Sequence, residues 1–322
     1  VYDALVPYYI GEIYLLREEW QKADEVASDY LRHFAGHKDE NEMKRIQGEA
    51  RYGMSDYHSA VPLLEEYVQA VSAPRRKALY ALGMSHYQTG AFLKVPESLG
   101  LVVTDQDALS QNAYLHMGLA YLQLKERNLA RMAFEQASVA DEDKAVKEQA
   151  LYNYALCIHE TSYSPFAESV TVFERFLNEF PNSRYRDRVN DYLVETYMNT
   201  RSYDAALKSI AKIGRPGPRI LEAKQKILFR LGTQAFVNAD FAQARQYFDR
   251  SLEVGAYDAE TRANANYWRG EAHYRQANYQ AAARDFRMYL ELTKNKQSQE
   301  YSWALYGLGY ANFQQKNYSQ AL

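Results

Sequence analysis

Apolar residues recur at intervals of three and four along most of the chain, with a small residue near the centre of each run. The runs YALGMSHY, which begins at Tyr80, and YGLGYANF, which begins at Tyr306, show the pattern. This spacing places the apolar side chains on one face of an α-helix. Prolines and glycines are few, 8 and 15 in 322 residues, which favours helices over a sandwich or barrel. The pattern predicts an all-α fold.

The small residues mark an internal repeat of 35 to 39 residues. The first anchors are Gly11, Gly48, Gly83, Gly118, Ala155, Val194, Gly232, Gly270 and Gly309. Twelve residues after most of them stands a second anchor: Ala23, Ala60, Val95, Ala130, Ala206, Ala244, Ala282 and Ala321, with Ser169 at a longer distance in the fifth repeat. Two helices per repeat are expected, about 17 in all, in eight full repeats and a truncated ninth.

Glycine inside a helix costs about 1 kcal/mol relative to alanine, so its recurrence requires a structural reason. Close packing of a glycine in the first helix against the alanine of the second helix supplies one. Between the two anchors an aromatic residue recurs, at Trp20, Tyr57, Phe92, Phe166, Tyr203, Phe241, Tyr279 and Tyr318; the fourth repeat has Arg127 there. We expect these rings to fill the corner between the two helices.

The spacing, the paired small residues and the corner aromatic resemble the tetratricopeptide repeat (TPR). The segments FERFLNEFPNS (173–183), QARQYFDRSL and QAAARDFRMYL match its second helix. The resemblance covers essentially the whole chain. It implies a right-handed superhelical α-solenoid of antiparallel helix pairs, a single domain over residues 1–322, and a protein–protein interaction scaffold rather than an enzyme. Residues 214–219, which include the sequence RPGPR, are either a hinge between repeats six and seven or one more inter-repeat turn.

Charge is unevenly distributed along the chain. Residues 1–160 carry a net charge of −8 and residues 161–322 a net charge of +5. The basic residues of the second half are scattered among acidic ones, so a nucleic-acid partner is not expected. No run of apolar residues approaches the roughly 20 that a membrane helix needs. The sequence leaves self-association open.

No catalytic constellation is recognisable, and no cofactor is expected. Gly-rich phosphate loops, nucleophile elbows and His-Glu-x-x-His motifs are missing from the sequence. His33 and His37 stand near Asp39 and Glu42, but they fall at a helix end and in the following turn, so we interpret them as solvated residues and expect no metal. Cys157 occupies a position that is small in other repeats, and we expect it in the core.

The resemblance places the residue three positions before each first anchor, and the residue one position after it, on the concave groove of the solenoid. From these positions and their neighbours we select residues that are expected to line a groove for a protein or peptide partner. They are Tyr8, Tyr80, Met84, Leu115, Tyr152, Arg188, Lys226, Phe229, Arg230, Tyr267 and Tyr306. Tyrosine combines apolar area with a hydroxyl group and few rotatable bonds, which suits peptide binding. The alternative interpretation is that tyrosine at this position serves packing.

Charges along these positions run from acidic at Glu12, Glu42 and Glu49 to basic at Arg188, Lys226 and Arg230. An extended partner is therefore expected to be basic at one end, apolar in the middle and acidic at the other. Some TPR proteins clamp a chaperone's terminal carboxylate with Lys and Asn side chains. That mode is not expected here, because Tyr152 and Leu156 stand where one side of the clamp would be.

Two further hypotheses concern the context of the chain. The segment FxxFLxxxPNS resembles bacterial cell-envelope TPR proteins, such as outer-membrane assembly lipoproteins and Tol–Pal-associated periplasmic factors, which favours a periplasmic or cell-envelope location over a cytoplasmic one. The alternative function is a regulatory or substrate-recruiting arm of a larger enzyme, such as a sensor kinase or glycosyltransferase. Both ends of the sequence are expected to continue into a longer protein.

Overall fold

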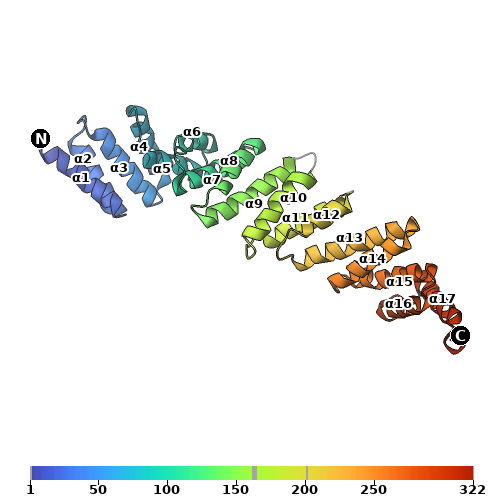
Figure 1. The fold of residues 1–322 in the computed structure, drawn as a ribbon. Coiled ribbons are helices and arrows are strands. Elements are labelled where there is room, and N and C mark those ends of the chain that lie inside the picture. The colour runs from blue at the N-terminus through green and yellow to red at the C-terminus, as the bar shows by residue number, and fades with distance from the viewer. Residues whose placement is uncertain (1, 162–164, 201, 322) are drawn as a thin grey trace. The chain divides into compact units, whose positions relative to one another are not determined.

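The computed structural model describes residues 2–161, 165–200 and 202–321. Over these residues the chain is a succession of helices, with no β-strand among them (Figure 1). Two compact units are present, residues 1–163 and residues 164–322. The described helices form no segment that is both long enough and apolar enough to cross a membrane.

The first unit contains α1 (Tyr2–Leu16), α2 (Trp20–His33), α3 (Glu40–Gly53), α4 (Tyr57–Ala70), α5 (Arg76–Gln88), the 3-10 helix η1 (Phe92–Lys94), α6 (Val95–Leu99), α7 (Ala108–Gln123), α8 (Arg127–Val139) and α9 (Lys144–Thr161). The second contains α10 (Pro165–Glu179), α11 (Arg186–Asn199), α12 (Tyr203–Ile210), α13 (Pro218–Val237), α14 (Phe241–Val254), α15 (Ala259–Arg275), α16 (Tyr279–Leu292), α17 (Gln299–Gln314) and α18 (Tyr318–Ala321).

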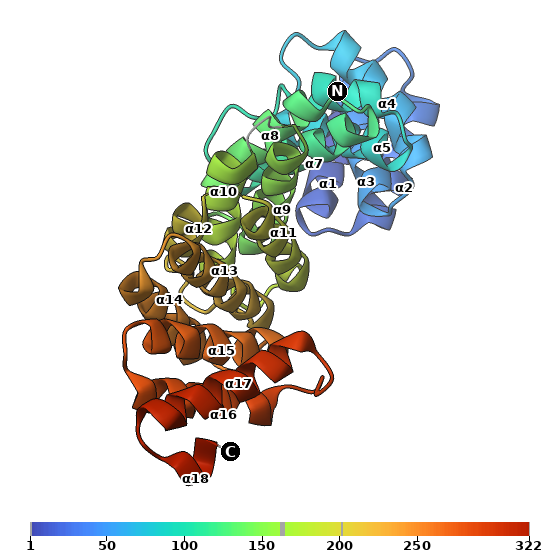
Figure 2. The same cartoon turned by 90° about the vertical axis from the view of Figure 1, so that its right-hand side faces the viewer.

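These helices alternate along the sequence as the first and second helices of the expected repeats. The second helix of the third repeat is divided into η1 and α6, and that of the last repeat, α18, is short. Within the first unit, α1, α3, α5, α7 and α9 contact one another in succession, and α1, α3, α5 and α7 each also pack on the helix that follows them. In the second unit α13, α15 and α17 also contact one another in succession, and α14 and α16 each pack on the first helices that precede and follow them in the sequence (Figure 2). The prediction of an all-α array of helix pairs is confirmed.

The turn between the two helices of a repeat has a recurring backbone conformation. In the second repeat Ser55 has a φ of 63°, its N–H donates to the carbonyl of Tyr52 at 2.9 Å, and the N–H of Asp56 donates to the carbonyl of Arg51 at 2.8 Å. This is the Schellman ending of a helix, which usually places glycine at the left-handed residue. The residue at the equivalent position of six other repeats also has a positive φ. These residues are Glu18, Gly90, Lys125, Ala239, Ala277 and Lys316.

The second helix begins directly after this turn, at the residue expected to be the corner aromatic. Where the preceding residue is Asp56, Asp240 or Asn278, its side chain accepts a hydrogen bond from the third N–H of the helix. The corner rings pair with an aromatic residue five positions earlier, with ring centroids 5.2 to 5.9 Å apart for Tyr52–Tyr57, Tyr87–Phe92, Phe236–Phe241, Tyr274–Tyr279 and Phe313–Tyr318. The side chain of Phe166 lies outside the described residues.

The expected contact between the two anchors needs a correction. Gly48, Gly83, Gly118, Gly232 and Gly270 lie against the second helix, and the closest neighbour of each is a large side chain one turn after the second anchor. Gly11 lies instead against Ile46 of α3, and Gly309 against the carbonyl of the anchor Ala321. A Cβ on Gly48, Gly118 or Gly232 would lie 2.5 to 2.6 Å from Leu64, Phe134 or Phe248, respectively. The alanine anchors Ala23, Ala60, Ala130, Ala206, Ala244 and Ala282 are fully buried. The glycine therefore makes room for a fully buried leucine or phenylalanine, and burial of this large apolar side chain between the two helices stabilises the pair.

The segment 214–219 lies inside the second unit, between α12 and α13. The side chain of Asn178 on α10 accepts a hydrogen bond from the N–H of Gly214 and donates one to the carbonyl of Lys212. Gly217 precedes α13, and Pro218 is its first residue, a favoured position for proline. The predicted hinge at this place stays a prediction.

Candidate interaction groove

Three rows of side chains share one face of the first helices α13, α15 and α17. They stand six positions before, three positions before and one position after the anchor glycine, a spacing that places them on the same side of each helix. The rows are Lys226, Asn264 and Trp303; Phe229, Tyr267 and Tyr306; and Thr233, Glu271 and Tyr310.

Two pockets of about 880 and 650 Å³ open along this face. Both are lined by Tyr267, Trp268 and Trp303, so they adjoin. The larger one extends over α13 and α15 to Phe229 and Thr233, and the smaller one extends to Tyr306 and Tyr310 on α17. We call the two pockets together the aromatic groove. Volumes of this size are typical of pockets that hold ligands.

The side chains of α17 are the most exposed aromatic residues of the groove. Trp303 is 49%, Tyr306 66% and Tyr310 44% exposed, and the rings of Tyr306 and Tyr310 lie 4.5 Å apart. Large exposed aromatic side chains that gather on one surface are typical of interaction sites.

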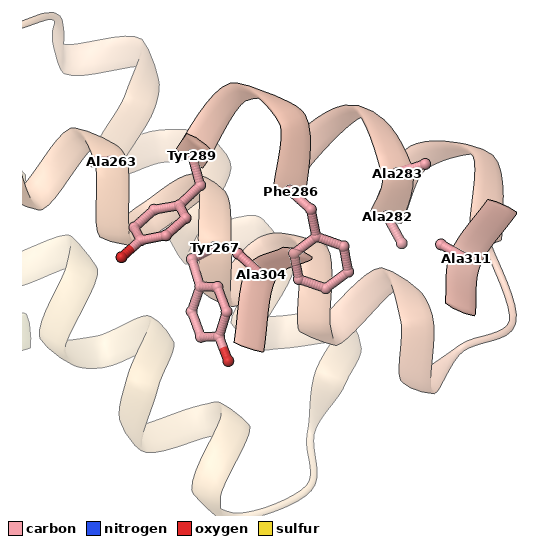
Figure 3. Close-up of a cluster of buried hydrophobic side chains, with 8 residues drawn as sticks. All are labelled: Ala263, Tyr267, Ala282, Ala283, Phe286, Tyr289, Ala304 and Ala311. Carbon is pink, nitrogen blue, oxygen red and sulfur yellow. The ribbon is translucent and has the colours of Figure 1, made fainter. Parts of the chain in front are cut away.

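Tyr267 forms the floor of the groove. Its ring lies 5.3 Å from that of Tyr289 and 5.9 Å from that of Phe286, within the core cluster of α15, α16 and α17 (Figure 3). Burial raises the pKa of the Tyr267 hydroxyl, and the neighbouring carboxylate of Glu271 raises it further. The edge of Trp268 meets the Tyr267 ring at 5.4 Å and that of Phe236 at 5.0 Å. These contacts hold the floor in place.

The basic residues selected on α13 already have partners within the chain. Lys226 lies 2.6 Å from a carboxylate oxygen of Glu222 and 3.2 Å from one of Asp258. Arg230 donates a hydrogen bond to the hydroxyl of Tyr203 at 2.9 Å. Arg188, on α11, is exposed. Of the residues selected in this unit, the structure brings Phe229, Tyr267 and Tyr306 together in the groove.

The residues selected in the first unit take part in its internal packing. The hydroxyl of Tyr80 donates to Asn112 at 2.8 Å, and the hydroxyl of Tyr8 accepts from Arg75 at 2.9 Å. Met84, Leu115 and Tyr152 are buried.

The acidic positions near the N-terminus surround a buried arginine. Arg45 is 1% exposed, and its guanidinium donates to Glu42 at 2.8 Å, to Glu49 at 2.9 Å and to Glu12 on α1. Arg75 adds a second positive charge, 3.0 Å from Glu12. The carboxylates at this end are therefore neutralised within the chain.

The other residues considered for chemistry have structural contacts. Nδ1 of His33 lies 2.8 Å from the carbonyl of Asp29, and Nδ1 of His37 lies 2.8 Å from the hydroxyl of Tyr30. The part of the chain that the structure describes contains no group of three or more His, Cys, Asp or Glu side chains placed to hold a metal. Cys157 is buried, as expected, and burial raises the pKa of its thiol to about 11.

Sequence analysis missed Trp268 and Trp303 as groove residues. Trp303 stands six positions before its anchor, and Trp268 stands two positions before its anchor. The family resemblance placed neither of these two positions on the groove. The available signal was composition: two of the three tryptophans of the chain fall in neighbouring first helices.

Comparison with known proteins agrees with the repeat pattern. The tetratricopeptide repeat family model matches residues 47–94 and 229–298. None of the curated proteins matches the chain.

The solved structures that are similar to this chain include the following three. A tetratricopeptide repeat protein from Parabacteroides merdae has 13% identity and a TM-score of 0.44, over 81% of this chain and 97% of its own. The C-terminal part of a TPR repeat-containing protein from Cytophaga hutchinsonii has 14% identity and a TM-score of 0.44, over 94% and 99%. The Cut9–Hcn1 hetero-tetramer of the APC/C has 14% identity and a TM-score of 0.36, over 97% and 84%. The family match shows tetratricopeptide repeats at residues 47–94 and 229–298, and the succession of helix pairs continues the same architecture through the described residues of both units.

Proposed function

We propose that the chain is a protein–protein interaction scaffold and that the aromatic groove of α13, α15 and α17 binds an extended segment of a partner protein. The observation that carries this proposal is the exposure of Trp303, Tyr306 and Tyr310 along two adjoining pockets. Tryptophan and tyrosine are enriched among the residues that contribute most to binding energy. The TPR fold in general supports a role in protein binding.

The dimensions of the groove fit a short peptide. Packed helices lie roughly 8–10 Å apart, so three successive first helices span about 20 Å. An extended chain rises about 3.3 Å per residue, so roughly six residues cross the groove. Its floor is fixed by Tyr267, packed on Tyr289 and Phe286, so little ordering of the floor is needed on binding.

Selection of displayed random twelve-residue peptides on the full chain tests the proposal. Peptides that are enriched are synthesised with a fluorescent label, and their affinity is measured by anisotropy. We expect Trp303→Ala and Tyr306→Ala each to weaken binding by roughly tenfold or more, because truncation of a central aromatic anchor typically costs at least about 1–2 kcal/mol. Phe313→Ala is the matched control, because Phe313 is an exposed aromatic residue of the same helix that lines neither pocket. Enriched peptides that bind both groove variants as tightly as the unmodified chain would disprove the proposal.

A further inference from the structure

Glu271 is a half-buried carboxylate in the wall of the smaller pocket, which it shares with seven aromatic residues and Arg275. The aromatic residues are Phe236, Tyr267, Trp268, Tyr274, Trp303, Tyr306 and Tyr310. Among the residues that the structure describes, none forms a hydrogen bond or an ion pair with the Glu271 carboxylate. Burial raises its pKa above the ordinary value, and the more distant charge of Arg275 lowers it in part. A carboxylate in this setting is costly unless a cation or donor joins it.

The first two repeats show how the same chain satisfies a carboxylate at this position. Glu12 stands one position after its anchor glycine, as Glu271 does. Arg45, three positions before the next anchor, extends its guanidinium from α3 to Glu12 on α1. A buried guanidinium on one first helix thus neutralises the carboxylate on the preceding one.

In the last two repeats the residue equivalent to Arg45 is Tyr306, three positions before Gly309. Tyrosine brings no positive charge to Glu271, and the Tyr306 ring is largely exposed. Near the N-terminus, α1 and α3 hold a guanidinium between Glu12, Glu42 and Glu49. The equivalent helices α15 and α17 have instead an open, aromatic-lined space beside the Glu271 carboxylate.

We propose that the partner supplies the missing guanidinium: an arginine side chain of the bound segment enters the smaller pocket, pairs with Glu271 and stacks on the rings of α17. This inference rests on the proposed function of the groove. A guanidinium fits because it binds carboxylates through two parallel hydrogen bonds and stacks on aromatic faces, whereas an ammonium group offers only a point charge. Lysine is accepted less well for the same reason.

The charges of the adjoining pocket agree with a basic partner. Asp258, Glu260 and Glu300 line it together with Lys294. Asp258 is neutralised by Lys226 at 3.2 Å, while Glu260 and Glu300 are exposed. Basic residues beside the anchor arginine would meet these carboxylates, which favours fast association at low salt.

A double-mutant cycle tests the pairing. Each groove-binding peptide from the selection is synthesised with its arginine residues unchanged. In further versions each arginine in turn is replaced by citrulline, its neutral isostere, or by lysine. On the unmodified chain we expect the citrulline peptide to bind roughly tenfold more weakly than the arginine peptide, within the range expected for an ion pair combined with a cation–π contact. On Glu271→Gln this difference should fall to about two- to fivefold, because only the cation–π contact with the rings of α17 then remains. Glu291→Gln, which removes an exposed carboxylate of α16 outside both pockets, should leave it unchanged.

A second readout follows the pocket directly. Trp20→Phe leaves Trp268 and Trp303 as the tryptophans of the chain, and both line the smaller pocket. Addition of the arginine peptide to this variant should change the tryptophan fluorescence. The same addition to the variant that also carries Glu271→Gln should require a peptide concentration that is higher by roughly two- to fivefold.

The possible results separate the two proposals. Peptides that depend on Trp303 but contain no arginine or lysine, or an equal citrulline effect in the Glu271→Gln and unmodified chains, would overturn the arginine anchor and leave the groove standing. Enriched peptides of which none depends on Trp303 or Tyr306 would overturn both proposals.

Discussion

The ring of Phe248 occupies the space in which any residue other than glycine at position 232 would place its Cβ. That atom would lie 2.5 Å from Cε1 of the ring, closer than real Cβ contacts. Gly232 is on α13, and Phe248 is a fully buried residue of α14. Equivalent pairs hold the two helices together in other repeats, including Gly118 with Phe134.

Substitution of this glycine should therefore destabilise the chain despite the better helix propensity of alanine. Overpacking costs typically about 1–3 kcal/mol, and the gain in propensity returns about 1 kcal/mol. We expect Gly232→Ala to lower the urea midpoint, with the double variant Gly232→Ala/Phe248→Leu losing less than the sum of its two single changes. Strict additivity of the two changes would show that these residues do not interact.

A glycine at the left-handed position of the repeat turn should have the opposite effect. Ala239 has a φ of 61°, which is unfavourable for a residue with a Cβ. Ala239→Gly should stabilise the chain by about 0.5–1 kcal/mol. Ala242→Gly, three residues later and inside α14, should destabilise it by a similar amount. Denaturant titrations that show both substitutions to be destabilising would contradict this account of the turn.

Loss of Arg45 should be among the most damaging substitutions in the first unit. Arg45→Met leaves Glu12, Glu42 and Glu49 close together without their shared cation, and removal of one partner of a buried ion pair typically costs about 3–5 kcal/mol. The loss should be smaller in acid, where the carboxylates are protonated. Adding Glu49→Gln should restore part of the stability at neutral pH. A variant as stable as the unmodified chain at neutral pH would show that the cluster is dispensable.

Glu271 should reduce stability at neutral pH. Its pKa is raised in the folded chain, so folding favours the protonated form. The stability that protonated Glu271 contributes is fully present below the ordinary glutamate pKa and is lost as the pH rises through the higher folded value. Glu271→Gln should therefore unfold at a higher denaturant concentration than the unmodified chain at pH 7, with a smaller difference near pH 4.

The pocket that Glu271 lines contains several other titratable side chains. They are Tyr267, Tyr274 and Arg275 on the same helix, and Tyr306 and Tyr310 on α17. The ordinary pKa values of arginine and tyrosine side chains lie well above pH 7. Glu291→Gln, on an exposed residue, is the control for the loss of one negative charge. A lower stability of Glu271→Gln at pH 7 would mean that the carboxylate supports the fold, and it would weaken the case for a site that awaits a cation.

The sequence by itself determined the repeat and its helices. The period of the small residues located the first helices, and the corner aromatics marked where α2, α4, α14 and α16 begin. Both signals are local, because they follow from helix periodicity and from the turn that joins two helices. The burial of Cys157 was predictable for the same reason, from its place in the repeat.

Only the tertiary structure decided which side chains the repeats leave open. Tyr80 and Tyr306 occupy the same position in their repeats, yet Tyr80 is hydrogen-bonded to Asn112 whereas Tyr306 is 66% exposed beside a pocket. Likewise Glu12 and Glu271 occupy the same position in their repeats. Glu12 pairs with Arg45 of the next first helix, whereas Glu271 faces Tyr306 and Tyr310 across the smaller pocket. The outcome depends on the residue that the next first helix presents, some 35 positions further along the chain, so it is set by packing between repeats rather than by the pattern within one.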